Sequence, residues 1–133
     1  MKRQILMTLM LGLYSGLLSA QCLFTELAFT TTVAEWGDEI HWELYFRSKN
    51  GDQLLASYRG DASEMVASKD IFCLEDGCYY FRLYDAWGDG WNGGALTCHP
   101  PIPGFSDDVT LEKGEEGYHL FHVRSHRRFR PRH

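Results

Sequence analysis

The sequence has few basic residues between its two ends. Residues 21–123 carry only 6 lysines and arginines against 18 aspartates and glutamates. A body this acidic does not attract nucleic acid or anionic lipid, so these two partner classes are excluded for it. Residues 124–133 have the opposite character, with five arginines and no acid. We expect this basic segment to be a solvated tail, with binding to anions or to the acidic body as the alternatives.

Long apolar runs are scarce as well, and helical periodicity is missing. No segment keeps helical spacing of apolar residues over three turns, and the chain has no internal repeat or low-complexity linker. The one long apolar run, residues 5–18, follows a basic start and precedes two small residues. This order predicts a signal peptide over residues 1–20, cleaved before Gln21. The run is shorter than the about 20 residues of a transmembrane helix, so we expect no membrane span in the mature chain.

The sequence has only four cysteines, and all of them follow the predicted cleavage site: Cys22, Cys73, Cys78 and Cys98. An even number in a small exported domain predicts two disulfides, with three pairings open. We favour Cys73–Cys78, because "CLEDGC" is typical of the tight end of a hairpin, which leaves Cys22–Cys98 as the second bond. A zinc site is the rival interpretation, but the cysteine spacing is irregular for zinc.

What the chain does have is the pattern of an all-β domain. Residues 39–46 and 78–86 alternate apolar and polar side chains, and Asn50-Gly51 is a strong hairpin signal. Short segments rich in strand formers recur at intervals of eight to twelve residues: 22–33, 39–46, 54–59, 65–73, 78–86, 95–99, 109–114 and 118–124. They predict a disulfide-stapled antiparallel β-sandwich or jelly roll over residues 21–123, with residues 100–108 as a surface loop and a last hairpin after it.

The stretch "DAWGDGWNGG", Asp85 to Gly94, is a candidate cation site. It is not an EF-hand loop, because Trp87 and Leu96 stand where ligands belong. Another kind of calcium site would use the side-chain oxygens of Asp85, Asp89 and Asn92. Two further acids, Asp107 and Asp108, could join from the proline-rich loop. The alternative is that the Asp and Asn side chains form Asx-turns and only shape the loop.

The same stretch is also a candidate ligand platform. Trp87 and Trp91 lie four residues apart, and Tyr84 lies just before them, with Tyr80 on the same strand face. Exposed aromatic rings beside Asp and Asn can stack on a sugar and hydrogen-bond its hydroxyls. The alternative is that these rings fill a small core.

No catalytic constellation can be assembled from the sequence. No serine stands in a recognisable nucleophile motif, and the cysteines are expected to be oxidised. His119 and His122 are three residues apart in a strand, so they point to opposite faces and cannot chelate one metal ion. We therefore expect a protein that is not an enzyme.

Two segments together resemble a known family. "HWELYFRSKNGDQLLAS" and "FCLEDGCYYFRLYDAWGDGWNGG" cover most of residues 42–94. They are similar to a β-sandwich module of proteins exported by bacteria that use the type IX secretion system, where it accompanies peptidases as a C-terminal, non-catalytic domain. The resemblance implies a secreted accessory or adhesion-type module.

The sequence thus predicts a secreted, non-catalytic binding or adhesion module, located outside the cell or on its surface, with the periplasm as an alternative location. The expected partner is a glycan or an extracellular protein, and the expected cofactor is calcium. A structural cell-surface protein without a small ligand is the alternative. A small secreted hydrolase or hydrolase inhibitor is the third interpretation.

Overall fold

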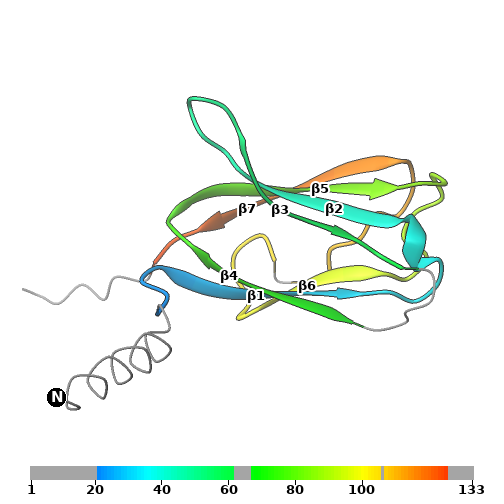
Figure 1. Ribbon diagram of the computed structural model, residues 1–133, viewed down its shortest axis with the longest axis horizontal. Coiled ribbons are helices and arrows are strands. Elements are labelled where there is room, and N and C mark those ends of the chain that lie inside the picture. The colour runs from blue at the N-terminus through cyan, green and yellow to red at the C-terminus, as the bar shows by residue number, and fades with distance from the viewer. Residues whose placement is uncertain (1–20, 62–66, 106, 126–133) are drawn as a thin grey trace, which may run out of the picture.

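A computed structural model describes residues 21–61, 67–105 and 107–125, and it shows two antiparallel sheets packed face to face (Figure 1). The three-stranded sheet has the order β4 (Ser68–Leu74), β1 (Thr25–Thr32) and β6 (Ala95–His99). The four-stranded sheet has the order β3 (Gln53–Arg59), β2 (Ile40–Phe46), β5 (Gly77–Asp85) and β7 (Glu116–Val123). A 3-10 turn, η1 (Gly37–Glu39), precedes β2. The prediction of a disulfide-stapled β-sandwich is confirmed.

The predicted signal peptide and residues 126–133 of the predicted basic tail lie outside the described residues. Within the described ranges, no helix is both long enough and apolar enough to span a membrane.

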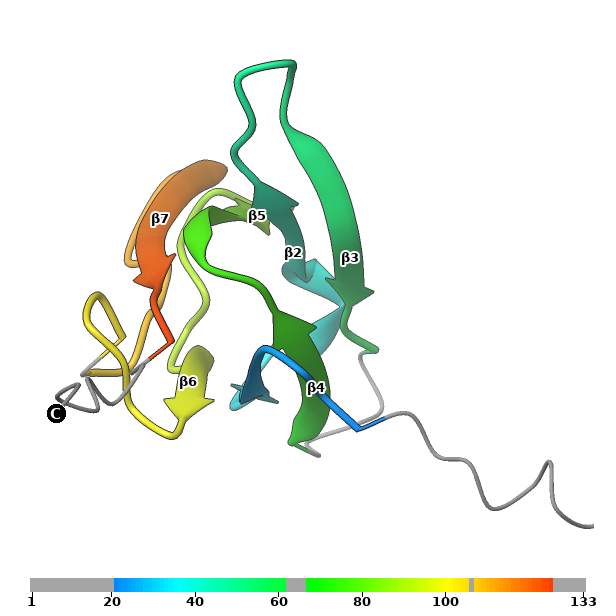
Figure 2. The ribbon, with the colours of Figure 1, turned by 90° about the vertical axis from the view of Figure 1, so that its left-hand side faces the viewer.

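The core forms because every second side chain of a strand points into the space between the two sheets, as the alternation in the sequence predicts. On β2 and β5 the inward positions are buried, and they are Ile40, Trp42, Leu44, Tyr79, Phe81 and Leu83. Phe29 of β1 contacts Phe81 across the sandwich, with ring centroids 5.0 Å apart. The Trp42 indole N–H donates a 2.9 Å hydrogen bond to the Thr31 hydroxyl, which satisfies both buried polar groups. The other side of β2 and β5 is therefore left facing outward (Figure 2).

The Asn50-Gly51 hairpin is confirmed. It joins β2 to β3, Gly51 has the positive φ of 116° that favours glycine, and its N–H donates to the Ser48 carbonyl at 3.2 Å. Figure 1 shows this hairpin projecting away from the body.

The predicted disulfide pairs are wrong. Cys22 is bonded to Cys73, and the two Cα atoms are 5.5 Å apart. The segment "CLEDGC" does not close a hairpin, because β4 and β5 lie in different sheets and the chain crosses from one to the other between them. Cys73 instead lies beside the start of β1, opposite Glu26, where Cys22 can reach it. Cys78 and Cys98 are free thiols.

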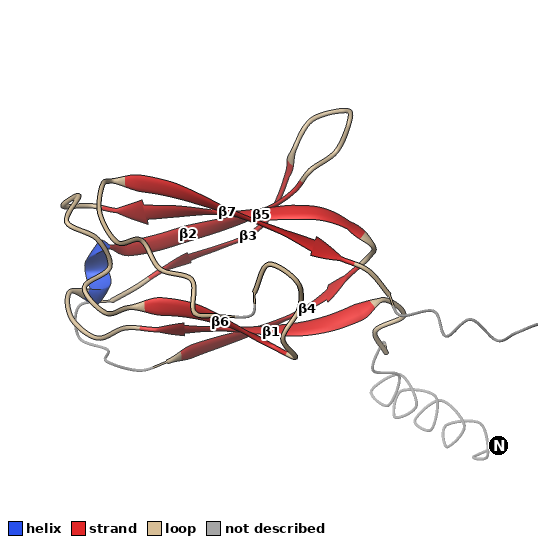
Figure 3. Ribbon diagram, turned by 180° about the vertical axis from the view of Figure 1, so that it is seen from behind, coloured by secondary structure: helices blue, strands red, loops and turns tan. Residues whose placement is uncertain are grey.

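The segment between β6 and β7 also differs from the prediction. Residues 109–114 form isolated bridges rather than a strand, since Val109 pairs with Leu96 and Gly114 with Asp89. No hairpin joins this segment to β7, whose partner is β5. The proline-rich loop before it, part of the tan segment that follows β6 in Figure 3, is not purely on the surface either. Phe105 is buried and packs on Phe29 with ring centroids 5.3 Å apart. A buried aromatic ring anchors the loop over the core.

Candidate binding face

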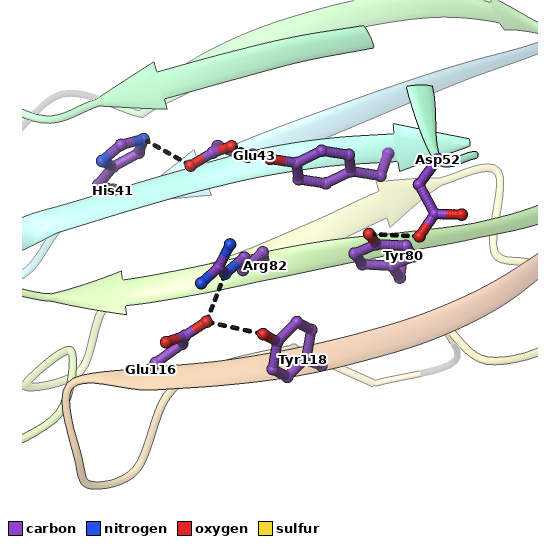
Figure 4. Close-up of polar contacts among 8 residues, drawn as sticks. His41, Glu43, Asp52, Tyr80, Arg82, Glu116 and Tyr118 are labelled. Atoms are coloured by element: carbon purple, nitrogen blue, oxygen red, sulfur yellow. Dashed lines mark hydrogen bonds and ion pairs between the residues drawn. The ribbon is translucent and has the colours of Figure 1, made fainter. Parts of the chain in front are cut away.

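The outer side of the four-stranded sheet carries a regular array of aromatic and charged side chains. The strand registers align them in three rows across β2, β5 and β7: His41–Tyr84–Glu116, Glu43–Arg82–Tyr118 and Tyr45–Tyr80–Leu120. We call these nine residues the polar-aromatic face. They lie on one surface because every second residue of a strand points to the same side. Figure 4 shows most of the polar members pointing away from the sheet on neighbouring strands.

The aromatic rings of this face contact each other and one arginine. Tyr45 and Tyr80 stack with centroids 5.0 Å apart and planes 12° from parallel. The Arg82 guanidinium carbon lies 5.0 Å from the Tyr84 ring centroid and 5.7 Å from that of Tyr118. Two cation–π contacts therefore hold Arg82 between two rings, at the middle of the face.

Two carboxylates organise the hydroxyls. Glu116 forms an ion pair with the Arg82 Nε and accepts a 2.8 Å hydrogen bond from the Tyr118 hydroxyl. Glu43 accepts a hydrogen bond from the hydroxyl of Tyr45. The Arg82 hydrogen bond lowers the pKa of Glu116, and the Tyr45 hydrogen bond lowers the pKa of Glu43. Both groups are therefore ionised acceptors at neutral pH.

The tyrosine hydroxyls are held in the protonated form. Partial burial, followed by a 2.8 Å hydrogen bond to Asp52, raises the pKa of Tyr80 to about 12. Partial burial and the contact with Glu43 raise the pKa of Tyr84 as well. At neutral pH the face consequently offers fixed hydroxyls, one guanidinium and two carboxylates, each oriented by a neighbour.

A cleft of about 380 Å³ lies at the end of the face where β5 meets the glycine-rich loop. His41 and Tyr84 form part of its wall, beside Arg59 of β3. The Arg59 guanidinium approaches His41 Nδ1 at 3.3 Å, so Nδ1 is the acceptor and the proton of the neutral ring is on Nε2. Burial, then the charge of Arg59, lowers the pKa of His41, which keeps it neutral at pH 7. The remaining walls include five carboxylates: Asp38, Glu39, Asp85, Glu115 and Glu116.

The glycine-rich loop proves to be a hydrogen-bonded turn with one exposed tryptophan. Asp85 is buried, and its carboxylate accepts bonds from the N–H groups of Gly90 at 2.6 Å and Trp87 at 3.3 Å. The Asx-turn interpretation therefore describes Asp85. Gly90 has a φ of 95°, and a side chain there would collide with the Glu112 carbonyl.

The predicted platform is only partly formed. Trp87 is 79% exposed, but Trp91 is 1% exposed and its indole N–H donates to the Tyr84 carbonyl at 2.8 Å. Trp91 is therefore a core residue, and its assignment to a ligand platform is wrong. Tyr84 lies on the polar-aromatic face together with Tyr80, as the alternation of β5 predicts. The candidate platform residues Tyr80 and Tyr84 thus lie on the sheet, and only Trp87 is an exposed ring of the loop.

Two acids of the loop, Asp85 and Asp89, lie close to Glu39, which the sequence did not indicate as a ligand. Oxygens of Glu39, Asp85 and Asp89 lie within 4.8 Å of one another. Asn92, a predicted ligand, lies beside this acidic triad, where its side-chain N–H₂ donates a 3.4 Å hydrogen bond to Asp89. Asp107 and Asp108 do not join it. Glu39 is near because β2 pairs with β5, which places Ile40 opposite Asp85.

The sequence also missed Arg82, Glu43, Glu116 and Tyr118. Alternation alone places Arg82 outward, but only the order β2-β5-β7 brings β7 residues beside it. Comparisons with protein-family models, curated proteins and solved structures found no match to this chain. The resemblance to exported modules thus stays a prediction.

Proposed function

We propose that the chain is an exported, non-catalytic module that binds a glycan on its polar-aromatic face. The observation that carries this proposal is the group of four tyrosine rings with Arg82, Glu43 and Glu116 fixed among them on one sheet face. Sugars have apolar C–H faces that stack on aromatic rings and hydroxyls that bond to charged groups. A face that supplies both, already oriented, suits such a ligand.

The distribution of charge favours a glycan over a protein partner. Glu43 lies beside Arg82 in the central row of the face, and Glu116 pairs with Arg82 from the neighbouring row. Arginine and tyrosine are common in protein–protein interfaces, but glutamate and aspartate are depleted there. A charged, hydroxyl-rich centre is better suited to a ligand that is itself covered with hydroxyls.

Two features support the exported and non-catalytic parts of the proposal. The Cys22–Cys73 disulfide and the predicted signal peptide both fit an oxidising compartment outside the cytoplasm. Glycoside hydrolysis usually needs one carboxyl whose pKa is raised, so that it can act as an acid. The pKa values of Glu43 and Glu116 are both lowered, which suits binding rather than proton donation.

We expect Tyr80→Ala to weaken glycan binding about tenfold, because an aromatic stacking contact contributes up to about 1.5 kcal/mol. The wild-type protein would be screened on a broad glycan array, and the affinity for the strongest ligand measured by calorimetry. Trp87→Ala is the matched control, since it removes an exposed ring outside the face and should leave affinity unchanged.

The array also distinguishes the alternatives. If the folded wild-type protein binds no glycan on the array, the proposal is contradicted and a structural surface protein is favoured. A loss caused by Trp87→Ala but not by Tyr80→Ala would place the ligand on the glycine-rich loop instead.

Calcium binding at the acidic triad is a second proposal. Three carboxylates supply the hard oxygens that calcium prefers, and Asp85 is already fixed by two N–H groups. Desolvation, then repulsion by Asp89 and Asp85, raises the pKa of Glu39. A divalent cation would relieve that repulsion. Calcium would act here by rigidifying the loop beside the face.

At calcium concentrations about tenfold above its Kd, we expect stabilisation by about 1.4 kcal/mol and a rise in Tm of about 5 °C at pH 7. Differential scanning fluorimetry with calcium and then with a chelator measures this shift. Glu39→Gln should remove it, whereas Asp107→Asn, outside the triad, should not. Because the pKa of Glu39 is raised, its carboxylate is lost early on acidification, so the shift should shrink towards pH 4. An equal shift in Glu39→Gln, or none in the wild type, would contradict calcium binding by the triad.

A further inference from the structure

A second cavity, separate from the polar-aromatic face, is almost entirely apolar. It has a volume of about 460 Å³ and lies at the opposite end of β7 from the acidic cleft. Leu27 of β1 and Val123 of β7, both buried in the core, form part of its wall. The rest is formed by Thr25, the segment Pro100 to Pro103, His122 and Arg124. We call it the proline groove.

The wall of the proline groove is rigid and mostly apolar. Three of the four residues between Pro100 and Pro103 are prolines, which have fixed φ angles and no N–H to satisfy. The fourth, Ile102, is half-buried and packs against the core. Phe105, two residues after Pro103, is buried and anchors the segment, and its N–H donates to the Ile102 carbonyl at 2.8 Å. A rigid apolar wall with few polar groups is the usual form of a small-molecule site.

The groove carries a positive charge, Arg124, in a molecule that is mostly acidic. Among the described residues of its lining, only Arg124 and His122 have titratable side chains, and none is a carboxylate. Residues 21–123 have three times as many acidic as basic residues, so an acid-free lining with an arginine stands out. Arg124 forms no ion pair with any described residue. Charge complementarity therefore favours an anionic head group on the ligand.

We propose that the proline groove binds a small amphipathic monocarboxylate, the chemistry of a medium-chain fatty acid. Its aliphatic chain lies against Leu27, Ile102 and the prolines, and its carboxylate pairs with Arg124. The chain gains from burial at roughly 25 cal/mol per Å² of apolar surface. This binding is independent of the glycan proposal, because no residue of the polar-aromatic face lines the groove.

The test is calorimetric titration of the mature chain, residues 21–133, with decanoate, below its micelle concentration, and with decanol as the uncharged probe. Saturable one-site binding of decanoate is expected. Arg124→Gln should weaken it about fivefold, the upper end for an exposed ion pair, and leave decanol binding unchanged. Ile102→Glu should weaken decanoate binding at least about tenfold, because it puts a carboxylate of the protein in the apolar site, next to the carboxylate of decanoate.

Two control variants show whether decanoate binds in the groove or elsewhere on the surface. Ile71→Glu changes an exposed apolar residue on the outer side of β4 and should bind decanoate like the wild type. Tyr80→Ala should also bind decanoate normally, whatever its effect on glycans. Circular dichroism of each variant shows whether it folds, and Arg124→Gln, at an exposed position, keeps the test decisive if Ile102→Glu does not fold.

Three results would overturn the proposal. One is no saturable binding of decanoate to the wild type. Another is equal binding to Ile102→Glu, which would indicate association with the basic tail. The third is a groove that protein already fills. If the basic tail fills it, Phe129→Ala in that tail should strengthen decanoate binding. If a second copy of the chain fills it, Ile102→Glu should convert a dimer to a monomer in sedimentation velocity.

Discussion

Replacing Cys22 and Cys73 together by serine is expected to lower the free energy of unfolding by about 4 kcal/mol. The bond joins residues separated by 51 positions, and closing a loop of that size removes about this much conformational freedom from the unfolded chain. It also holds the start of β1 against the end of β4, at the edge of the three-stranded sheet. Chemical denaturation of the oxidised wild type and of the double variant measures the difference.

The matched control is the double variant Cys78→Ser and Cys98→Ser. These thiols are unpaired and only half-buried, so we expect a change smaller than about 1 kcal/mol. A loss of about 4 kcal/mol in this control, or a Cys73–Cys78 peptide in a non-reduced digest, would contradict the pairing described above.

Trp91→Ala is expected to destabilise the protein by about 3–5 kcal/mol, the range for removing a buried large aromatic side chain. Trp91 is among the largest fully buried side chains, and its backbone N–H also donates to the Leu111 carbonyl at 2.8 Å. The truncation leaves a cavity beneath the glycine-rich loop and frees the Tyr84 carbonyl that the indole satisfied.

Trp87→Ala provides the comparison within the same loop. Its side chain is mostly in water, so the expected change in unfolding free energy is below about 0.5 kcal/mol. If the two substitutions change the free energy of unfolding equally in urea denaturation, Trp91 is not buried. Such a result would support the predicted ligand platform in the loop.

The sequence predicted the faces of the strands better than the connections between them. Alternation in residues 39–46 and 78–86 identified which side chains enter the core, because a two-residue period is a local property of a strand. The same alternation placed Tyr80 and Tyr84 together on one outer face. That assignment holds whichever strands lie beside β5, so it could be made without knowing the strand order.

The errors arose where a local signal was decided by distant structure. The turn residues of "CLEDGC" suit a hairpin and an inter-sheet crossing equally well, and only the partner of β4 distinguishes them. Trp91 and Trp87 have similar polar, glycine-rich neighbours in the sequence. Only Trp91 is buried, and its backbone N–H bonds to the Leu111 carbonyl, 20 positions away. Pattern alone cannot assign such pairs to the core or to the surface.

The candidate site was incomplete for the same reason. Glu39 joins the acidic triad, and Glu116 joins Arg82, through strand pairings between residues 34 or more positions apart. Strand order in a sandwich is non-local, because consecutive strands can lie in different sheets. The residue types of the site were visible in the sequence, but their association depended on which strands flank β5.

Glycan binding at the polar-aromatic face can be tested directly by chemical-shift mapping with the strongest ligand from the array. The amide resonances of uniformly labelled protein would be followed during titration with that glycan. We expect the largest shifts to cluster on β2, β5 and β7 around Glu43, Arg82 and Tyr118. Largest shifts in the glycine-rich loop around Trp87, or along the proline groove, would contradict binding at the polar-aromatic face.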